Sequence, residues 1–468
     1  MKAPRITVYI ACHNHEAYIE EAIESVLRQA HGDWELLIYD DNSADGSSGL
    51  INLYSGDPRI RCFTTSGVGL PSIANMAIEA ARGEYIVRLD GDDYLDENML
   101  LVLANYLDRH PDMALVFPDY YLVDEFGNIS SREWREKLFH SNHVLDMPPH
   151  GACTMIRRTV LQEVGGYRED LGAQDGFDLW VKVKSQYRAG NVNIPLFYYR
   201  RHEGNLTGNV HRIANARRRI KNDAVADRLD AFRPITAVIP CRQNYDFVRD
   251  LWKQDVNGRS LLQRALDHCT SASLFDRIVV ACDNPQAEEV VAAYKDKRVE
   301  FVLREAADTI RSHSIVPTLD RIVKPTENLN GITVLHYVQA PFLSVATLEE
   351  AIATLILEDA DTSFGVEEIR ELAYKRTSHG LQAINRVGGL GSDFSTIYRE
   401  VPSLVALNNK NLRFGSMFGP RLVSFVATPE ESYFINSQEK LDIATVLAKR
   451  FDGTGRPSAR PVMRREIP

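Results

Sequence analysis

The strongest constraint on the fold is an alternation of short apolar runs with segments of helical spacing, which occurs twice along the chain. In the first half, residues 6–11 read as a strand, residues 19–29 place apolar side chains three or four positions apart, and residues 34–39 form a second apolar run. Residues 73–81 then have helical spacing, and residues 85–89 form a third strand-like run. Strands that alternate with helices predict a mostly parallel sheet, in which ligands bind at the carboxyl ends of the strands.

The second half repeats this pattern. Residues 235–239, Ile-Thr-Ala-Val-Ile, echo residues 6–10, Ile-Thr-Val-Tyr-Ile, and a cysteine and a polar loop follow in both places. The further expected elements are a helix at 261–269, a strand at 277–281, a helix at 286–294, a strand at 334–338 and a helix at 348–357. We therefore predict an α/β chain with two tandem Rossmann-like three-layer domains. The expected divisions are a first domain at 1–210, a basic helical linker at 211–232, a second domain at 233–452 and a flexible tail at 453–468.

Composition narrows the classes of function. The 468 residues are enough for two or three domains, at roughly 100–200 residues each. The net charge of −10 argues against a broad nucleic-acid-binding face. Six cysteines lack metal-binding spacing, which favours free thiols in a reducing compartment. No apolar run reaches the roughly 18 residues of a spanning helix. We expect a cytoplasmic protein, for which peripheral contact with the inner face of a membrane stays open.

Acidic clusters follow two of the expected strands. Asp40-Asp41-Asn42-Ser43 follows residues 34–39, and Asp90-Gly91-Asp92-Asp93 follows residues 85–89. Two carboxylates at a strand end can hold a hard divalent cation such as Mg²⁺ or Mn²⁺, together with substrate phosphates. The glycine would let a diphosphate approach the backbone. Taken alone, the second cluster is better explained as a solvated turn that caps the next helix.

Six short motifs of the first domain occur in the order that is typical of one protein family. Over about residues 4–208, the chain resembles the family 2 glycosyltransferases, which are inverting enzymes with the GT-A fold. The motifs are Ile10-Ala11-Cys12-His13-Asn14, Tyr39-Asp40-Asp41-Asn42-Ser43, Leu89-Asp90-Gly91-Asp92-Asp93, Gly165-Gly166-Tyr167, Gln174-Asp175-Gly176 and Tyr199-Arg200-Arg201-His202.

This resemblance implies a role for each matching residue. Asp175 would be the general base that accepts the proton of the acceptor hydroxyl. Asp92 and His202 would bind the Mn²⁺ or Mg²⁺ cofactor. The implied nucleotide contacts are Ala11, His13, Asn14, Asp41 and Asp90. Alternatives stay open at two positions: Asp175 could simply cap a helix, and His202 could be structural. Gln174 stands where the family usually has Glu, which favours the ionised form of Asp175.

From residue 235 to about 450, the chain resembles the acylneuraminate cytidylyltransferases, whose fold is related to GT-A. The matching pieces include Val238-Ile239-Pro240-Cys241-Arg242, Asn257-Gly258-Arg259-Ser260-Leu261, Val338-Gln339-Ala340-Pro341 and Tyr433-Phe434-Ile435-Asn436. The resemblance implies Arg242, Gln339 and Asp442 as candidate site residues of this domain.

In this chain, the residues of the loop that binds phosphate in that family are changed. Gln243-Asn244-Tyr245-Asp246 stands where glycines, Ser and Lys belong, and Asn436 stands where a metal-binding Asp is usual. Carboxylates at Asp246 and Asp250 would repel a triphosphate. We therefore expect no nucleotidyl transfer and a scaffolding role, either dimerisation or docking. The alternative is that Lys253, Arg259 and Arg304 supply the missing positive charge.

The leading hypothesis is a metal-dependent inverting glycosyltransferase of hexosyltransferase type. It would transfer a sugar from a nucleotide-diphosphate sugar to a saccharide or glycolipid acceptor in cell-surface polysaccharide or glycoconjugate biosynthesis. One alternative is a bifunctional enzyme with an active CTP-dependent second domain, and another is a non-catalytic assembly protein.

Overall fold

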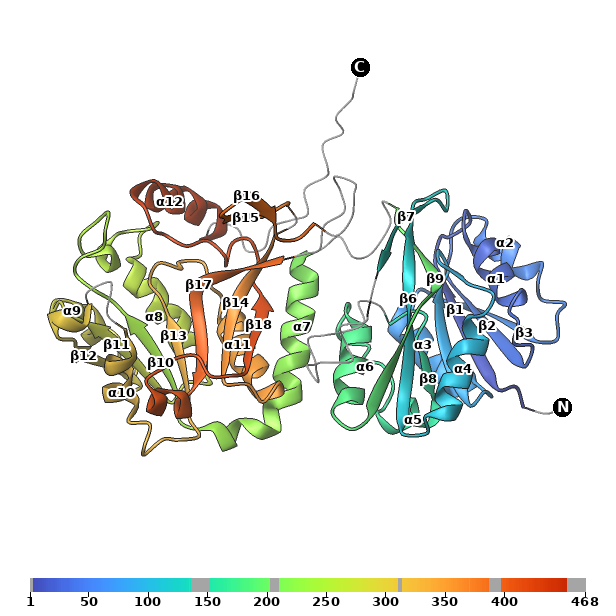
Figure 1. Cartoon of the computed structure of the whole chain (residues 1–468), viewed down its shortest axis with the longest axis horizontal. Helices are drawn as coiled ribbons and strands as arrows, with labels where there is room; N and C mark the ends of the chain where they lie inside the picture. Colours follow the sequence, from blue (N-terminus) through green and yellow to red (C-terminus); the bar gives the residue numbers. More distant parts are fainter. Residues whose placement is uncertain are drawn as a thin grey trace, which may run out of the picture. The chain divides into compact units, whose positions relative to one another are not determined.

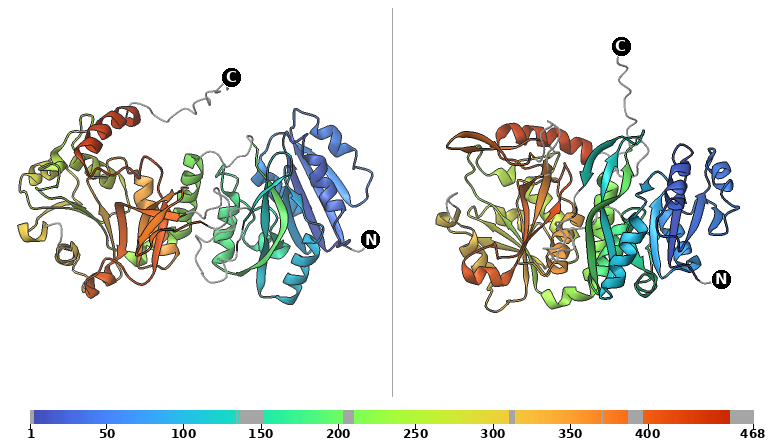
Figure 2. Two further views of the ribbon diagram at one scale, coloured as in Figure 1. Left: turned by 45° about the horizontal axis from the view of Figure 1, so that its top comes forward. Right: turned by 45° about the vertical axis from the view of Figure 1, so that its right-hand side comes forward.

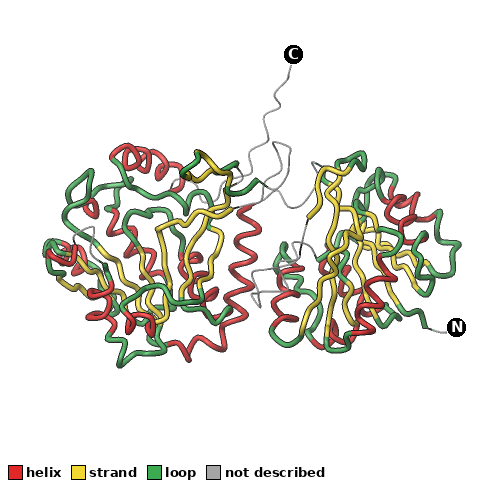
Figure 3. The backbone as a smooth tube through the Cα atoms, viewed as in Figure 1, coloured by secondary structure: helices red, strands yellow, loops and turns green. Residues whose placement is uncertain are grey.

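Two large sheets, of nine and seven strands, organise the described part of the chain (Figures 1 and 3). The computed structural model describes residues 3–133, 135, 151–202, 210–309, 314–369, 371–386 and 397–452. The chain divides into two compact units, Met1–Ile220 and Lys221–Pro468. The predicted tail at 453–468 lies outside the described residues.

The sheet of the first unit is parallel in its N-terminal half and mixed beyond it. Its order is β3-β2-β1-β4-β8-β6-β9-β5, and β7 pairs with β6. The strands are β1 Ile6–Cys12, β2 Trp34–Asp41, β3 Ile60–Thr65, β4 Tyr85–Asp90, β5 Tyr94–Leu95, β6 Met113–Val123, β7 Ile129–Glu133, β8 Met155–Arg157 and β9 Arg188–Arg200. The parallel strands β1, β2 and β4 confirm the predicted alternation, and the structure adds the parallel strand β3. The long strands β6 and β9, which run side by side in Figures 1 and 2, were not predicted.

Helices cover both faces of this sheet, so the unit has three layers. The helices are α1 Ile19–Leu27, α2 Ser47–Asn52, α3 Leu70–Ala80, α4 Met99–Arg109, α5 Arg158–Glu163 and α6 Asp175–Lys184. On β1, Ile6, Val8 and Ile10 pack on the side of α1 and α4, whereas Tyr9 packs on the side of α3, α5 and α6. Both faces of β1 are therefore apolar, which is typical of a central parallel strand.

The second unit has the same three-layer arrangement. Its sheet has the order β12-β11-β10-β13-β17-β14-β18, and β15 and β16 form a separate hairpin. The strands are β10 Ile235–Pro240, β11 Arg277–Cys282, β12 Val299–Leu303, β13 Ile332–His336, β14 Thr362–Ile369, β15 Tyr374–Thr377, β16 Gly380–Ala383, β17 Ile397–Asn408 and β18 Leu422–Val426. The α-helices are α8 Leu261–Ser271, α9 Ala287–Ala292, α10 Val316–Val323, α11 Val345–Leu357 and α12 Gln438–Asp452. Helix α10 packs on one face of this sheet, and α8 and α11 pack on the other.

Local sequence signals fix several element ends. Ser260 precedes α8 and forms a capping box, in which its hydroxyl accepts from the N–H of Gln263 and the Gln263 side chain accepts from the N–H of Ser260. The basic helix predicted between the domains is α7, Val210–Val225, which is followed by a 3₁₀ helix at Ala226–Phe232.

The six cysteines are free, and all except Cys62 are buried. Every described helix is too short or too polar to cross a membrane.

Candidate functional site

The predicted acidic motifs meet at the carboxyl edge of the first sheet. Because β1 lies between β2 and β4 and is parallel to both, their C-terminal ends lie at one edge. Ala11 on β1 is in register with Tyr39 on one side and with Asp90 on the other. The chain then turns at Asp41 and at Asp90, so the sheet places the two acidic clusters on either side of Ala11.

The carboxylate of Asp92 faces the imidazole of His202. Their atoms Oδ2 and Nε2 lie 2.9 Å apart, although the two residues are 110 positions apart in the sequence. Both side chains are mostly buried, with exposed fractions of 12% and 14%. The structure therefore brings together the two residues that were predicted as metal ligands.

Arg200 holds this pair in place from the end of β9. Its backbone N–H donates to Asp93 Oδ1 at 2.9 Å, and its Nε donates to the carbonyl of Asp92 at 2.9 Å. These two bonds fasten the strand that carries His202 to the turn that carries Asp92. Asp93 is buried below the turn, and burial raises the pKa of its carboxyl well above the ordinary value, with a further contribution from Asp92 and Asp90.

Arg88 joins two of the predicted site residues. It lies two positions before Asp90 on β4, so both side chains point to the same face of the sheet. Its Nε and one terminal nitrogen donate to the two oxygens of Asp90 at 2.6 and 3.0 Å. Its other terminal nitrogen donates to Asp175 Oδ2 at 2.8 Å. Burial alone would lower the pKa of this guanidinium, but Asp90 and Asp175 hold it well above the usual value.

Asp175 is the first residue of α6, and a close backbone contact fixes its position. Gln174 precedes it in a left-handed conformation, with φ of 63°, and its side chain accepts a hydrogen bond from Arg217. A Cβ on Gly176 would lie 3.0 Å from the nitrogen of Gly151 and 3.1 Å from its Cα. Glycine at both positions therefore allows the segment at Gly151 to pack against the start of α6, beside Asp175.

The carboxylate of Asp41 accepts hydrogen bonds from other residues of the first unit. Its Oδ1 accepts hydrogen bonds from the hydroxyl of Thr65 and from the N–H groups of Gly67 and Val68, and its Oδ2 accepts from the N–H of Gly69. Burial alone would raise the pKa of Asp41, but these bonds lower it. The predicted nucleoside contact at this residue stays a prediction, and the structure adds the role of ordering the 65–69 loop.

His13 and Asn14 tie the end of β1 to the loop after β2. The His13 Nδ1 lies 2.7 Å from the carbonyl of Asp41, and the Asn14 side chain accepts from the N–H of Ala44 at 2.7 Å. Asn14 has a φ of 58°, a conformation that Asn tolerates better than most residues. Both side chains are exposed at the carboxyl edge, where a nucleotide contact was predicted.

Three residues of this site were not predicted: His15, Arg88 and Arg200. A Cβ on Gly91 would lie 2.7 Å from the Nδ1 of His15, so this glycine makes room for the imidazole. The His15 ring lies 6.5 Å from that of His202, edge to face. A sequence signal existed for Arg88, because it is a charged residue within the otherwise apolar run Tyr85-Ile86-Val87-Arg88-Leu89.

The donor set at Asp92 and His202 fits a divalent cation. Carboxylate oxygen and imidazole nitrogen both bind Mn²⁺, and Mg²⁺ often binds through one or two carboxylates with substrate phosphates and water. Among the described residues, no group of three or more His, Cys, Asp or Glu side chains forms a closed metal site. A cation here would therefore be held by two protein side chains, with its other positions left for the substrate and water.

The three predicted site residues of the second unit contact different neighbours and do not contact one another. Arg242 lies 4.7 Å from the ring centroid of Tyr245, and the carbonyl of Gln339 accepts from the N–H of Ile435. Asp442 is exposed on α12 and accepts from Gln438, one turn earlier. No hydrogen bond or ion pair connects these three candidates in the described part of the unit.

The altered loop of the second unit is folded onto neighbouring side chains. Asp250 has a φ of 50°, and its Oδ1 accepts from the side chain of Asn284 at 2.9 Å. The basic side chains that were considered as a source of the missing positive charge already have partners. Lys253 contacts Gln286 and Asp250, and Arg259 pairs with Asp267. Arg304 is buried and donates to the carbonyl of Cys241.

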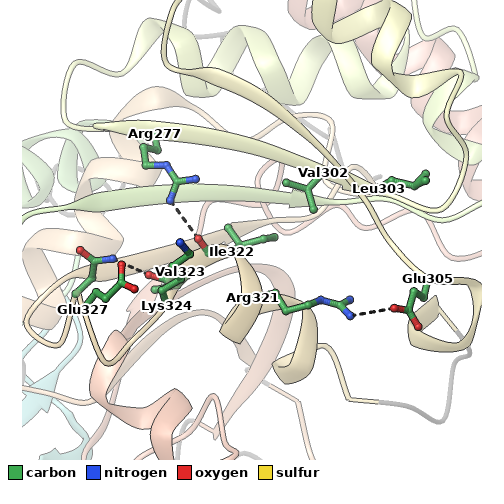
Figure 4. A pocket seen from close by; sticks show the side chains of 10 residues that line it. Arg277, Val302, Leu303, Glu305, Arg321, Ile322, Val323, Lys324 and Glu327 are labelled. Carbon is green, nitrogen blue, oxygen red and sulfur yellow. Dashed lines mark hydrogen bonds and ion pairs between the residues drawn. The ribbon is translucent and has the colours of Figure 1, made fainter.

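A cavity of about 530 Å³ lies elsewhere in the second unit, beside α10 and the edge strand β12 (Figure 4). Figure 4 shows Arg277 directed at the carbonyl of Ile322 and Arg321 directed at Glu305. Arg277 also makes two hydrogen bonds to Glu300, so its charge is balanced. None of the predicted site residues is part of the lining of this cavity.

Comparison with known proteins finds similarity within the first unit. Residues 7–165 match the sequence model of the family described as Glycosyl transferase family 2. The chondroitin synthase of Escherichia coli is 25% identical over 183 residues, which are 39% of this chain and 27% of the relative. The hyaluronan synthase of Pasteurella multocida is 28% identical over 196 residues, which are 41% of this chain and 20% of the relative. The chain thus spans less than a third of the length of these relatives.

Two solved structures are similar at low identity. Staphylococcus aureus TarS 1–349 in complex with UDP-GlcNAc is 19% identical, with a TM-score of 0.41, and the match covers 47% of this chain and 66% of that one. CMP:2-keto-3-deoxy-manno-octonic acid synthetase complexed with CTP is 13% identical, with a TM-score of 0.36, and the match covers 46% of this chain and 99% of that one. The family match supports the predicted resemblance to family 2 glycosyltransferases, and it covers residues 7–165 of the stretch at about 4–208 for which the resemblance was predicted.

Proposed function

We propose that this chain is an inverting glycosyltransferase that uses a divalent cation to transfer a sugar from a nucleotide-diphosphate sugar to a saccharide acceptor. The observation that carries the proposal is the meeting of Asp90, Asp92, Asp175 and His202 at one edge of a sheet, within and just after a family 2 region. Two relatives of this region are named as synthases of the polysaccharides chondroitin and hyaluronan, which supports a place in polysaccharide or glycoconjugate assembly.

The proposed reaction is a single displacement. Asp175 accepts the proton of an acceptor hydroxyl, and that oxygen forms a bond to the anomeric carbon of the donor sugar. The bond from this carbon to the diphosphate breaks, and the nucleoside diphosphate leaves with the bonding electrons. Attack opposite the leaving group inverts the anomeric configuration.

The chain supplies the groups that this reaction needs. Asp175 has an exposed side-chain fraction of 18%, so one oxygen bonds Arg88 while the carboxylate still reaches solvent. Asp92 and His202 would hold Mg²⁺ or Mn²⁺, which when bound would neutralise the charge on the leaving diphosphate. Ala11, His13, Asn14, Asp41 and Asp90 line the edge at which we place the nucleotide.

The test is transfer by the full chain over a panel of UDP-, GDP-, TDP- and CDP-sugars, with and without Mn²⁺. We expect one donor class to react only with the cation, and NMR of the product to show the inverted anomer. D175N should bind the nucleoside diphosphate normally and lose about 10²- to 10⁴-fold in kcat, the usual contribution of a general base. The matched control is D227N, which alters an exposed carboxylate of the second unit. Wild-type turnover by D175N would overturn the assignment of the base.

We propose that the second unit acts as a scaffold, by dimerisation or docking, and does not activate sugars with CTP. The support is the altered loop, where Asp250 bonds Asn284, and where Lys253 and Arg259 have acidic or amide partners. Pyrophosphate release from CTP by the full chain, with sialic-acid-like sugars as co-substrates, tests this. Release at a catalytic rate would make the bifunctional enzyme the better description.

A further inference from the structure

We propose that Arg88 is a positioning residue that couples the donor side of the site to its general base. This inference rests on the proposed function and deepens it. The coupling is geometric: one guanidinium binds both oxygens of Asp90 and one oxygen of Asp175. Arg88 therefore sets the distance between the carboxylate placed at the donor nucleotide and the carboxylate placed at the acceptor hydroxyl.

The surroundings of Arg88 make this bridge rigid. Its side chain is only 10% exposed, and its own carbonyl accepts from the N–H of Cys153 at 2.7 Å. A Cβ on Gly151 would lie 3.6 Å from the nitrogen that binds Asp175, so the 151–153 segment packs along the guanidinium. The strand on one side and this segment on the other leave the guanidinium few alternative positions.

The planar fork of arginine is required for this geometry. It presents donors in fixed directions and can bind two carboxylates at once, whereas the ammonium of lysine acts as a single point charge. The bond to Asp175 Oδ2 also assigns the two oxygens of the base. Oδ2 is held by Arg88, and Oδ1 is left for the acceptor hydroxyl.

Among the residues that the structure describes, the other ionisable groups around this bridge do not supply a second cation to it. Tyr9 and Tyr167 face Arg88 and Asp175 from β1 and from the 165–167 turn, and burial raises the pKa of both phenols, that of Tyr167 to about 12, so both are neutral. Asp93 and the thiol of Cys153 are buried nearby, and burial raises the pKa of each. On α7, Arg217 binds the side chain of Gln174, next to the base in the chain.

The experiment compares R88Q, R88K and the control R157Q in the full chain. Arg157 is also partly buried in the first sheet, but it binds backbone carbonyls on the far side from the motifs. We expect R88Q to lose about 10²-fold in kcat at pH 7, as for a misplaced reacting group. Its KM for the donor should change much less than kcat, because loss of the bridge misplaces the base without removing a group that contacts the donor. R88K should keep the positive charge and still lose kcat, because an ammonium cannot hold both carboxylates in fixed directions. R157Q should lose stability and keep the wild-type kcat.

A second measurement does not depend on turnover. The thermal stability of wild type, R88Q, D175N and R88Q/D175N forms a double-mutant cycle. We expect D175N to cost clearly less in the R88Q background than in the wild type. Additive effects, or an R88Q variant that keeps the wild-type kcat, would overturn the role of Arg88. A coupled cycle in a wild-type protein that transfers no sugar from any donor would overturn the proposed function and leave the Arg88 bridge in place.

Discussion

The Oδ2 atom of Asp92 lies 2.9 Å from the Nε2 atom of His202, across 110 residues of sequence. This pairing depends on two elements that end at the same place, the turn after β4 and the end of β9. Arg200 fastens them through the backbone of Asp92 and the carboxylate of Asp93. The two donors are thus fixed in position before any ligand binds, which lowers the cost of ordering them around a cation.

This geometry predicts that the two residues contribute to one binding event. D92A should abolish the Mn²⁺-dependent part of nucleoside diphosphate binding, and H202A should weaken it by about 10- to 100-fold, as for loss of a ligand or of its supporting partner. Calorimetry with UDP, GDP, TDP and CDP, each with and without Mn²⁺, measures both effects. D227A is the control, because it removes an exposed carboxylate of the second unit. Binding by D92A that still depends on Mn²⁺ would show that the cation is held elsewhere.

Asp41 should stabilise the first unit in a pH-dependent way. The folded pKa is lowered, so its contribution is present above the unfolded value of about 3.9 and is lost as the pH falls through the folded pKa. D41N would direct its amide at the N–H of Gly69 and lose the charged acceptor. We expect a loss of about 2 kcal/mol at pH 7 that shrinks below pH 4, measured by chemical unfolding at several pH values. A pH-independent loss would assign the effect to packing instead.

The packing of Gly176 on Gly151 predicts a steric effect beside the base. G176A would put a methyl group 3.0 Å from a backbone nitrogen, which neither backbone can avoid without moving. We expect a stability loss of about 1–3 kcal/mol, typical of overpacking, and a fall in kcat of at least about tenfold, because Asp175 is the adjacent residue. Gly49 in α2 is the control, because a Cβ there meets nothing within 4 Å. G49A should be neutral or slightly stabilising, and equal effects of the two variants would contradict the steric explanation.

Much of the first unit could be predicted because its signals are local. The apolar runs at β1, β2 and β4 and the acidic residues directly after β2 and β4 lie within short segments, so periodicity was enough to place them at one edge. The pairing of β6 with β9 is different, because it joins Met113–Val123 to Arg188–Arg200 across two intervening strands and two helices. Neither strand has a simple two-residue alternation of polar and apolar residues, and β9 contains Asn191, Asn193 and Pro195.

The role of Arg88 could not be predicted for a similar reason. Its position next to Asp90 is readable on the strand, but the contact with Asp175 requires that α6 begin at that point of the edge. The tertiary structure alone decides this, through the Gly151–Gly176 contact and the left-handed Gln174. In the second unit, the sequence revealed the altered loop, whereas the partners of Asp250 and Arg259 became visible only in the structure.

The buried imidazole of His336 predicts acid sensitivity of the second unit. Burial, together with a smaller contribution from charge repulsion by His268, whose ring is stacked at 5.5 Å, lowers the pKa of His336 to about 3. The unfolded chain binds a proton near pH 6.5, but the folded chain does not until about pH 3. Stability should therefore be complete above pH 6.5 and fall as the pH decreases from there toward 3, by about 1.4 kcal/mol per pH unit.

Replacement of His336 tests the sign and the size of the predicted loss of stability at low pH. H336N should be less stable than wild type at pH 7, because it changes a fully buried side chain. Between pH 7 and pH 5, however, it should lose about 2 kcal/mol less than wild type, measured by urea unfolding followed through the second unit. H379N, in the exposed turn of the β15–β16 hairpin, should keep the wild-type pH dependence. If H336N and wild type lose stability in parallel over this range, another group must bind the proton on unfolding.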